Sequence, residues 1–169
     1  MFQQSEHPEK ILVTVRWDSV PAHWDWIGSD ENKQIMAGLS DHIAKDKVVL
    51  FHLDAEIFSR PAPQDAIPLL DSPLISLTRL FVDSDKKDAF SKKFNEVRGI
   101  LEDFAKPHLA RGGWRVDKEA ETKEEFVLVC GWESLERHFE FAKDPRFNEY
   151  KEIPELVTET DIKHFKRFL

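Results

Sequence analysis

His138 is the residue in this chain best suited to move a proton. It stands with Leu135, Phe139 and Ala142 at the spacing of one helix face, so we expect its imidazole to point from a helix towards a sheet. An imidazole can accept a proton near neutral pH, as quinol oxidation or an aldol-type cyclisation requires. The alternative is a buried histidine with a structural hydrogen bond. His23, at the matching place in a second copy of the same motif, favours that structural role.

Three aromatic residues accompany His138 in the candidate site. Tyr150, the only tyrosine, follows a break in the same helix and is the second catalytic candidate, because its hydroxyl group could reach the same cleft. Trp132 ends an apolar strand, and its ring could line a substrate pocket or simply pack against the helix that it introduces. Phe141, nine residues further on, completes the candidate substrate-binding face.

Two more candidates for substrate binding lie on either side of a glycine pair. His108 and Trp114 flank Gly112-Gly113, which predicts a flexible turn between a long helix and the next strand. Because loops often carry function, these side chains could form the mouth of a cleft. The alternative is a solvated loop that is anchored by one aromatic ring.

The remaining motifs argue against metal and cofactor chemistry. Seven histidines are scattered along the chain without a pair at helical ligand spacing, so we expect no metal site. Neither a glycine-rich phosphate loop nor a nucleophile elbow is present, and we expect no cofactor. The single cysteine, Cys130, lies between Val129 and Gly131 in an apolar run, which predicts a buried, unreactive thiol.

Composition limits the class of protein. With 169 residues, 41% of them apolar, the chain can bury one substantial core. A formal net charge of −8 would repel phosphate backbones, so we expect no nucleic-acid partner. No apolar run is long enough to span a membrane, and no signal peptide is evident. One cysteine, which excludes an intrachain disulfide, fits a reducing compartment, and the expected location is cytoplasmic.

The chain contains an internal repeat. The segment WDSVPAHWDW at residues 17–26 recurs as WESLERHFEF at residues 132–141, and an apolar run precedes each copy. This self-similarity predicts a duplicated unit in which a strand turns sharply into a helix. In the first copy we expect a strand over residues 11–17, a helix that Ser19 caps, and a second strand over residues 47–58. Residues 1–58 therefore predict a partial βαβ half-repeat.

The rest of the chain predicts a complete unit. Residues 59–73 hold four prolines and form a connector. From residue 74 we expect a strand to residue 82, a helix to about residue 105, a hairpin of residues 114–120 and 125–132 around Glu121-Thr122-Lys123-Glu124, a helix from Ser134, and a strand from residue 161 towards Leu169. This βαββαβ order over residues 74–169 is typical of an α+β, ferredoxin-like domain with both helices on one face of an antiparallel sheet.

These residues resemble a known family. The βαββαβ order, with Gly131-Trp132-Glu133-Ser134 opening the second helix and Asp144-Pro145-Arg146-Phe147 breaking it, is similar to the antibiotic-biosynthesis-monooxygenase-like (ABM) domain of the dimeric α+β barrel superfamily. The resemblance covers about the last 95 residues, with a partial echo at residues 11–58. It implies two sheets paired into a barrel, within a homodimer or an intrachain pseudo-dimer, and a small-molecule cleft between sheet and helices.

The resemblance also implies a range of functions. The leading expectation is binding of a small apolar, aromatic or polyketide-like molecule, with a cofactor-independent monooxygenase or cyclase activity that uses His138 as the base. The alternative is a non-catalytic interaction or scaffold protein, in which Phe and Trp side chains fill the space under the helices. Haem degradation is disfavoured, because the positions that hold a tryptophan, a histidine and an asparagine in haem-degrading relatives are Phe141, Lys151 and Thr78 here.

Overall fold

The computed structural model describes residues 1–60, 62–118 and 122–168; Pro61 in the connector, Glu119, Ala120 and Glu121 in the hairpin, and Leu169 lie outside the described residues. The chain forms two compact units. One comprises Met1–Thr14 together with Leu53–Leu169, and the other is Val15–His52. The two units differ from the three segments that the sequence repeat predicts, which are residues 1–58, 59–73 and 74–169. The division into these three segments stays a prediction.

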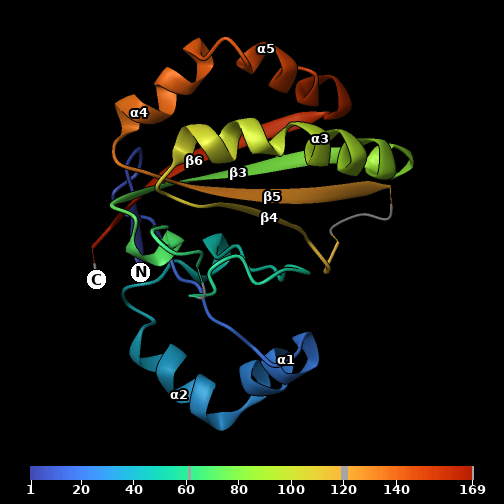
Figure 1. Cartoon of the computed structure of the whole chain (residues 1–169). Helices are drawn as coiled ribbons and strands as arrows, with labels where there is room; N and C mark the ends of the chain where they lie inside the picture. The colour runs from blue at the N-terminus through green and yellow to red at the C-terminus, as the bar shows by residue number, and fades with distance from the viewer. Residues whose placement is uncertain (61, 119–121, 169) are drawn as a thin grey trace. The chain divides into compact units, whose positions relative to one another are not determined.

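The larger unit contains the predicted βαββαβ domain. Its strands form one antiparallel sheet in the order β2-β1-β6-β3-β5-β4, so β3 is central and pairs with both β5 and β6. Helices α3, α4 and α5 all cover the same face of this sheet (Figure 1). The α+β, ferredoxin-like fold is thereby confirmed. The elements of this domain are β3 (Leu74–Asp83), α3 (Lys87–Ala105), β4 (Ala110–Trp114), β5 (Lys123–Trp132), α4 (Leu135–Glu140), α5 (Phe147–Tyr150) and β6 (Glu159–Arg167).

Short 3-10 turns connect these elements. They lie at Leu69–Asp71 before β3, Ser84–Lys86 before α3, Phe141–Lys143 after α4 and Ile153–Leu156 before β6. The predicted helix break near Pro145 is present, because α4 and its 3-10 extension end at Lys143 and α5 begins at Phe147.

A short hairpin extends the sheet beyond the predicted domain. Strand β1 (Phe2–Gln4) pairs with β6, and β2 (Ile11–Leu12) pairs with β1. The strand predicted over residues 11–17 is therefore mostly wrong, since only its first two residues join a ladder. Backbone groups form a strand only where a neighbouring strand supplies hydrogen-bond partners, and β1 is three residues long.

The smaller unit, Val15–His52, is helical. Helix α1 (Val20–Gly28) begins at the predicted cap, where Ser19 Oγ accepts a hydrogen bond from the Ala22 backbone N–H at 3.2 Å. Helix α2 (Asp30–Gly38) and a 3-10 turn at Lys45–Lys47 follow. The strand predicted over residues 47–58 is wrong: apart from an isolated bridge between Leu53 and Arg115, these residues pair with no other strand.

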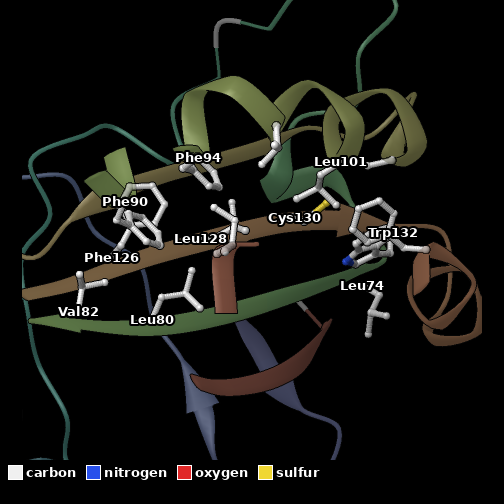
Figure 2. Packing of buried hydrophobic residues seen from close by; sticks show 14 residues of the cluster. Leu74, Leu80, Val82, Phe90, Phe94, Leu101, Phe126, Leu128, Cys130 and Trp132 are labelled. Atoms are coloured by element: carbon white, nitrogen blue, oxygen red, sulfur yellow. The ribbon is translucent and has the colours of Figure 1, made fainter. Parts of the chain in front are cut away.

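The core of the larger unit lies between α3 and the sheet. Helix α3 places an apolar face on β5, and Figure 2 shows Phe94 and Leu101 beside Leu128 and Cys130. Side chains at alternate positions of β5 face the helices, which explains why the apolar alternation predicted this strand correctly. Cys130 is buried as predicted, and burial raises the pKa of its thiol.

The glycine pair belongs to a strand and forms no turn. Gly112 and Gly113 both lie within β4, opposite Leu128 and Val127 of β5. A Cβ atom at Gly112 would lie 2.4 Å from the ring of Phe126, and one at Gly113 would lie 2.9 Å from Ala55 Cβ. The glycines therefore permit close approach of side chains, and the predicted turn is wrong.

No helix among the described residues is both long enough and apolar enough to cross a membrane.

Candidate functional site

The side chain of His138 stacks on a tryptophan and lies within hydrogen-bond distance of a second histidine. Its helix, α4, starts where Ser134 Oγ accepts a hydrogen bond from the Arg137 backbone N–H at 3.2 Å. The imidazole stacks on the buried ring of Trp132, with the ring centroids 4.6 Å apart. Its Nδ1 atom lies 2.8 Å from Nε2 of His164 on β6. The predicted inward orientation towards the sheet is consistent with these contacts.

A carboxylate completes this chain of hydrogen bonds. His164 Nδ1 lies 2.6 Å from Oε1 of Glu6, whose carboxylate also accepts the His164 backbone N–H at 3.1 Å. Burial raises the pKa of the Glu6 carboxyl group, but hydrogen bonds from the His164 side chain, from Gln4 and from backbone N–H groups together outweigh burial and lower the pKa. The tautomers of the two rings set the direction of these hydrogen bonds. In the arrangement in which His164 donates Nδ1–H to Glu6 and accepts His138 Nδ1–H at Nε2, the lone pair of His138 is on Nε2.

Burial sets the proton affinity of His138. Removal from water, together with the nearby His164, lowers the pKa of His138 to about 4. The imidazole is therefore neutral at pH 7 and can accept a proton, although it is a weaker base than an exposed histidine. The Glu6–His164 pair orients it, as the carboxylate partner of a catalytic histidine does in other enzymes.

The same constellation occurs in the unit Val15–His52. Trp17 stacks on His23 with centroids 4.3 Å apart, and His23 Nδ1 lies 2.6 Å from Nε2 of His52. Burial and the neighbouring His52 lower the pKa of His23. The internal repeat thus reproduces a Trp–His–His arrangement in space as well as a stretch of sequence.

A separate cavity of about 350 Å³ lies against α3, β4 and β5. Aromatic rings of Phe94, Trp114 and Phe126 form part of its wall, and Trp114 contacts Phe126 edge-on at 5.1 Å. Polar groups stand at the same site, among them Asp54, whose Oδ1 accepts the Trp114 backbone N–H at 2.7 Å. The other lining residues are Ala55, Glu56, Ile57, Ser91, Asn95, Arg98, Leu101, Glu102, Ala110, Arg111, Gly112, Gly113 and Leu128.

The structure separates the six predicted site residues into different places. Trp114 lines the cavity, whereas His138 and Trp132 are not among its lining residues. Phe126, at the cavity, and Trp132 are six residues apart on β5, roughly 20 Å along an extended strand. His108 is buried, and its Nδ1 lies 2.9 Å from Oγ of Ser72. Burial lowers the pKa of His108.

Tyr150 and Phe141 belong to an aromatic cluster beneath α4 and α5. Their ring centroids are 5.3 Å apart in an edge-on contact, and Phe147 contacts both rings. Burial raises the pKa of the Tyr150 hydroxyl, which makes its ionisation harder. These two side chains contribute to core packing and do not line the cavity described above.

Sequence reasoning missed three residues around His138. His164 and Glu6 form the hydrogen-bond chain, and Ser76 Oγ accepts the buried Trp132 Nε1–H at 2.9 Å. Ser76 and His164 face each other across β3 and β6, so both lie beside Trp132. The alternation of strand β6 was a usable signal for His164, but Glu6 comes from a loop for which no pattern existed. Among the described residues, no group of three or more His, Cys, Asp or Glu side chains could hold a metal ion.

Comparisons with known proteins concern the fold. No family model matches the sequence, and no curated protein matches it either. The structure is similar to a provisionally assigned antibiotic biosynthesis monooxygenase from Bordetella bronchiseptica (19% identity, TM-score 0.47, 57% of this chain and 97% of that chain). It is also similar to a variant of SnoaB, a cofactor-independent oxygenase from Streptomyces nogalater (13% identity, TM-score 0.43, 58% of this chain and 96% of that one).

A third similarity extends over most of the chain. A provisionally assigned monooxygenase from Fusobacterium nucleatum subsp. nucleatum matches 89% of this chain at a TM-score of 0.54 and 12% identity, over 65% of its own length. At this identity the match shows the fold alone. The match agrees with the α+β, ferredoxin-like fold that the strand order of the larger unit shows. A match over 89% of the chain includes more than residues 74–169.

Proposed function

We propose that the protein binds a small, largely apolar aromatic or polyketide-like molecule in the cavity against α3, β4 and β5. The supporting observation is the cavity itself, whose volume of about 350 Å³ and aromatic rings of Phe94, Trp114 and Phe126 suit a compact planar ligand, while the polar side chains of the lining can contact its oxygen atoms. The alternative of a scaffold without ligand predicts that Phe and Trp side chains fill this space. A cavity of that volume favours the ligand-binding role.

Titration with anthrone, a planar tricyclic ketone, tests this proposal. Binding should quench tryptophan fluorescence, because Trp114 lines the cavity. Trp114→Ala should weaken binding by about tenfold, since an aromatic contact contributes about 1 kcal/mol or more. Phe139→Ala is the matched control, because this exposed aromatic residue does not line the cavity. Equal affinities for the wild type and Trp114→Ala would reject the site.

A second candidate function is cofactor-independent oxygenation or cyclisation with His138 as the base. The observation that favours it is the chain of contacts from His138 Nδ1 to His164 and from His164 to Glu6, which holds the His138 ring in one orientation. For this activity anthrone would bind beside α4 in contact with His138, and not in the cavity against α3, β4 and β5. His138 would remove a proton from the CH₂ group, and the enolate would react with O₂. The balanced reaction turns the CH₂ group into a carbonyl group and releases one water, so that anthraquinone forms.

Oxygen uptake with anthrone tests the catalytic role. His138→Ala should abolish enzymatic turnover while the circular dichroism spectrum and anthrone binding stay unchanged. Glu6→Gln should keep a reduced rate with a shifted pH profile, because it retains a hydrogen-bond acceptor but removes the charge. Unchanged turnover in His138→Ala would reject this assignment and leave the binding proposal standing.

The assembly and location of the protein follow from the same resemblance as proposals. A homodimer is expected, as in proteins whose two sheets pair into a barrel, and light scattering of the purified protein tests it. The cytoplasmic location inferred from the single cysteine is testable by fractionation of cells that express the full chain.

A further inference from the structure

The internal repeat allows a position-by-position comparison of the two units. With Trp17 matched to Trp132, Val15 matches Cys130. Cys130 is 1% exposed, whereas Val15 is 65% exposed. Both residues are apolar and precede the same Trp–His stack, so the difference comes from what surrounds them.

In the complete unit, the central strand β3 provides those surroundings. Ser76 of β3 lies opposite Cys130 on one side and opposite His164 on the other. Its hydroxyl group accepts the indole N–H of Trp132. Strand β3 thus fills the space between the strand that ends in the tryptophan and the strand that carries the second histidine.

The unit Val15–His52 has counterparts of Trp132 and of His164, but it has no counterpart of strand β3 between them. Trp17 and His52 both contact His23, as Trp132 and His164 both contact His138. Every residue from 15 to 52 is described, and none of them forms a strand. Next to His52, the apolar residues Val48, Val49 and Leu50 are 55%, 65% and 37% exposed. We call Val15, Trp17, Val48, Val49 and Leu50 the half-unit surface.

We propose that the half-unit surface binds an extended β-strand of another polypeptide chain, in the place that β3 occupies in the complete unit. The strand would alternate apolar and polar residues like β3 and would carry a serine or threonine near Trp17, whose hydroxyl group accepts the indole N–H. The exposed Val15, Val48 and Val49 favour extended backbone, and an added strand would supply the hydrogen-bond partners that these segments need to join a sheet.

A second copy of this chain is a poor donor of this strand. Its own β3 pairs with β5 over Leu74–Asp83 and with β6 over Leu74–Phe81, so both edges of the strand are occupied. Release of β3 would unfold the sheet of the larger unit. We therefore assign the strand to a different polypeptide.

A synthetic peptide with the β3 sequence LISLTRLFVD, extended by two lysines for solubility, is the direct probe. Fluorescence anisotropy of the labelled peptide should show saturable binding to the full chain. Hydrogen exchange should slow at residues 15–17 and 48–52 when peptide is added. A scrambled peptide of the same composition should bind at least about tenfold more weakly, because strand addition requires the alternation of side chains.

Two protein variants locate the binding site. Val15→Asp should weaken peptide binding by about tenfold or more, since a carboxylate would be buried beneath the docked strand. Ile162→Asp is the matched control, because Ile162 is an exposed apolar residue, 43% accessible, on β6 of the complete unit. Circular dichroism verifies that both variants fold. Equal binding of the scrambled peptide, equal binding by Val15→Asp, or protection of residues 48–52 by self-association without peptide would overturn the proposal.

Discussion

Replacement of His138 by glutamine should remove a large part of the acid sensitivity of the folded state. The pKa of His138 falls from 6.5 to about 4 on folding. Between these two values the unfolded chain binds a proton that the folded chain does not bind. The free energy of unfolding therefore decreases as the pH falls from 6.5 to 4, and above pH 6.5 the group contributes no pH dependence.

The size of this effect follows from the shift. At about 1.4 kcal/mol for each pKa unit, the lowering of the pKa corresponds to about 3 kcal/mol between pH 7 and pH 4. His138 is half-buried, so screening by water reduces the observable loss to about 2 kcal/mol. The groups that surround it are His164, Trp132 and Phe139, with Glu6 beyond His164, and none of them offers a negative charge directly to His138.

Urea denaturation at pH 7, 5.5 and 4 measures this effect. The wild type and His138→Gln both lose stability through their carboxylates, including Glu6 with its lowered pKa, so the informative quantity is the difference between the two proteins. That difference should change by about 2 kcal/mol in favour of His138→Gln as the pH falls from 7 to 4. Ile35→Gln, an exposed apolar change in α2, should follow the wild type. Parallel pH dependence of the wild type and His138→Gln would refute the reasoning.

Two further predictions concern packing, and each is measured by chemical denaturation at pH 7. Ser76→Ala removes the acceptor of the buried Trp132 indole N–H and should cost about 1–3 kcal/mol, whereas a loss below about 0.5 kcal/mol would contradict the role of this hydrogen bond. Gly112→Ala places a Cβ atom 2.4 Å from the ring of Phe126 and should cost about 1–3 kcal/mol. The control Gly99→Ala, in α3 with no atom within 4 Å of the added carbon, should instead stabilise the protein by about 0.5–1 kcal/mol.

The complete unit was predictable from sequence because its strands are long and alternate strongly. Strand β5 buries nearly every position and β3 pairs along both edges, so the local pattern and the tertiary contacts agree. The strands predicted over residues 11–17 and 47–58 have the same apolar character. These two predictions were wrong because a segment forms a strand only when it pairs with another strand. The local sequence pattern does not show whether such a pairing strand is present.

The candidate site was less predictable because its contacts are distant in sequence. The pairing of His138 with His164, and of His164 with Glu6, joins residues that no helical or strand spacing relates. The glycine pair was misinterpreted for a similar reason. Gly112 fits a turn by composition, but its small size accommodates the ring of Phe126 from the neighbouring strand.

The duplicated Trp–His–His contact gives one polypeptide two versions of the same chemical arrangement. The version in the complete unit ends on the carboxylate of Glu6 and lies against a full sheet, and the version around His23 lies in a small helical unit. Both histidine pairs share temperature, ionic strength and sample history in a single NMR titration. The difference between the chemical shifts of the two histidine pairs at each pH would therefore report how an acidic neighbour and a surrounding sheet together alter imidazole protonation. The pair around His23 is the internal reference for the pair around His138.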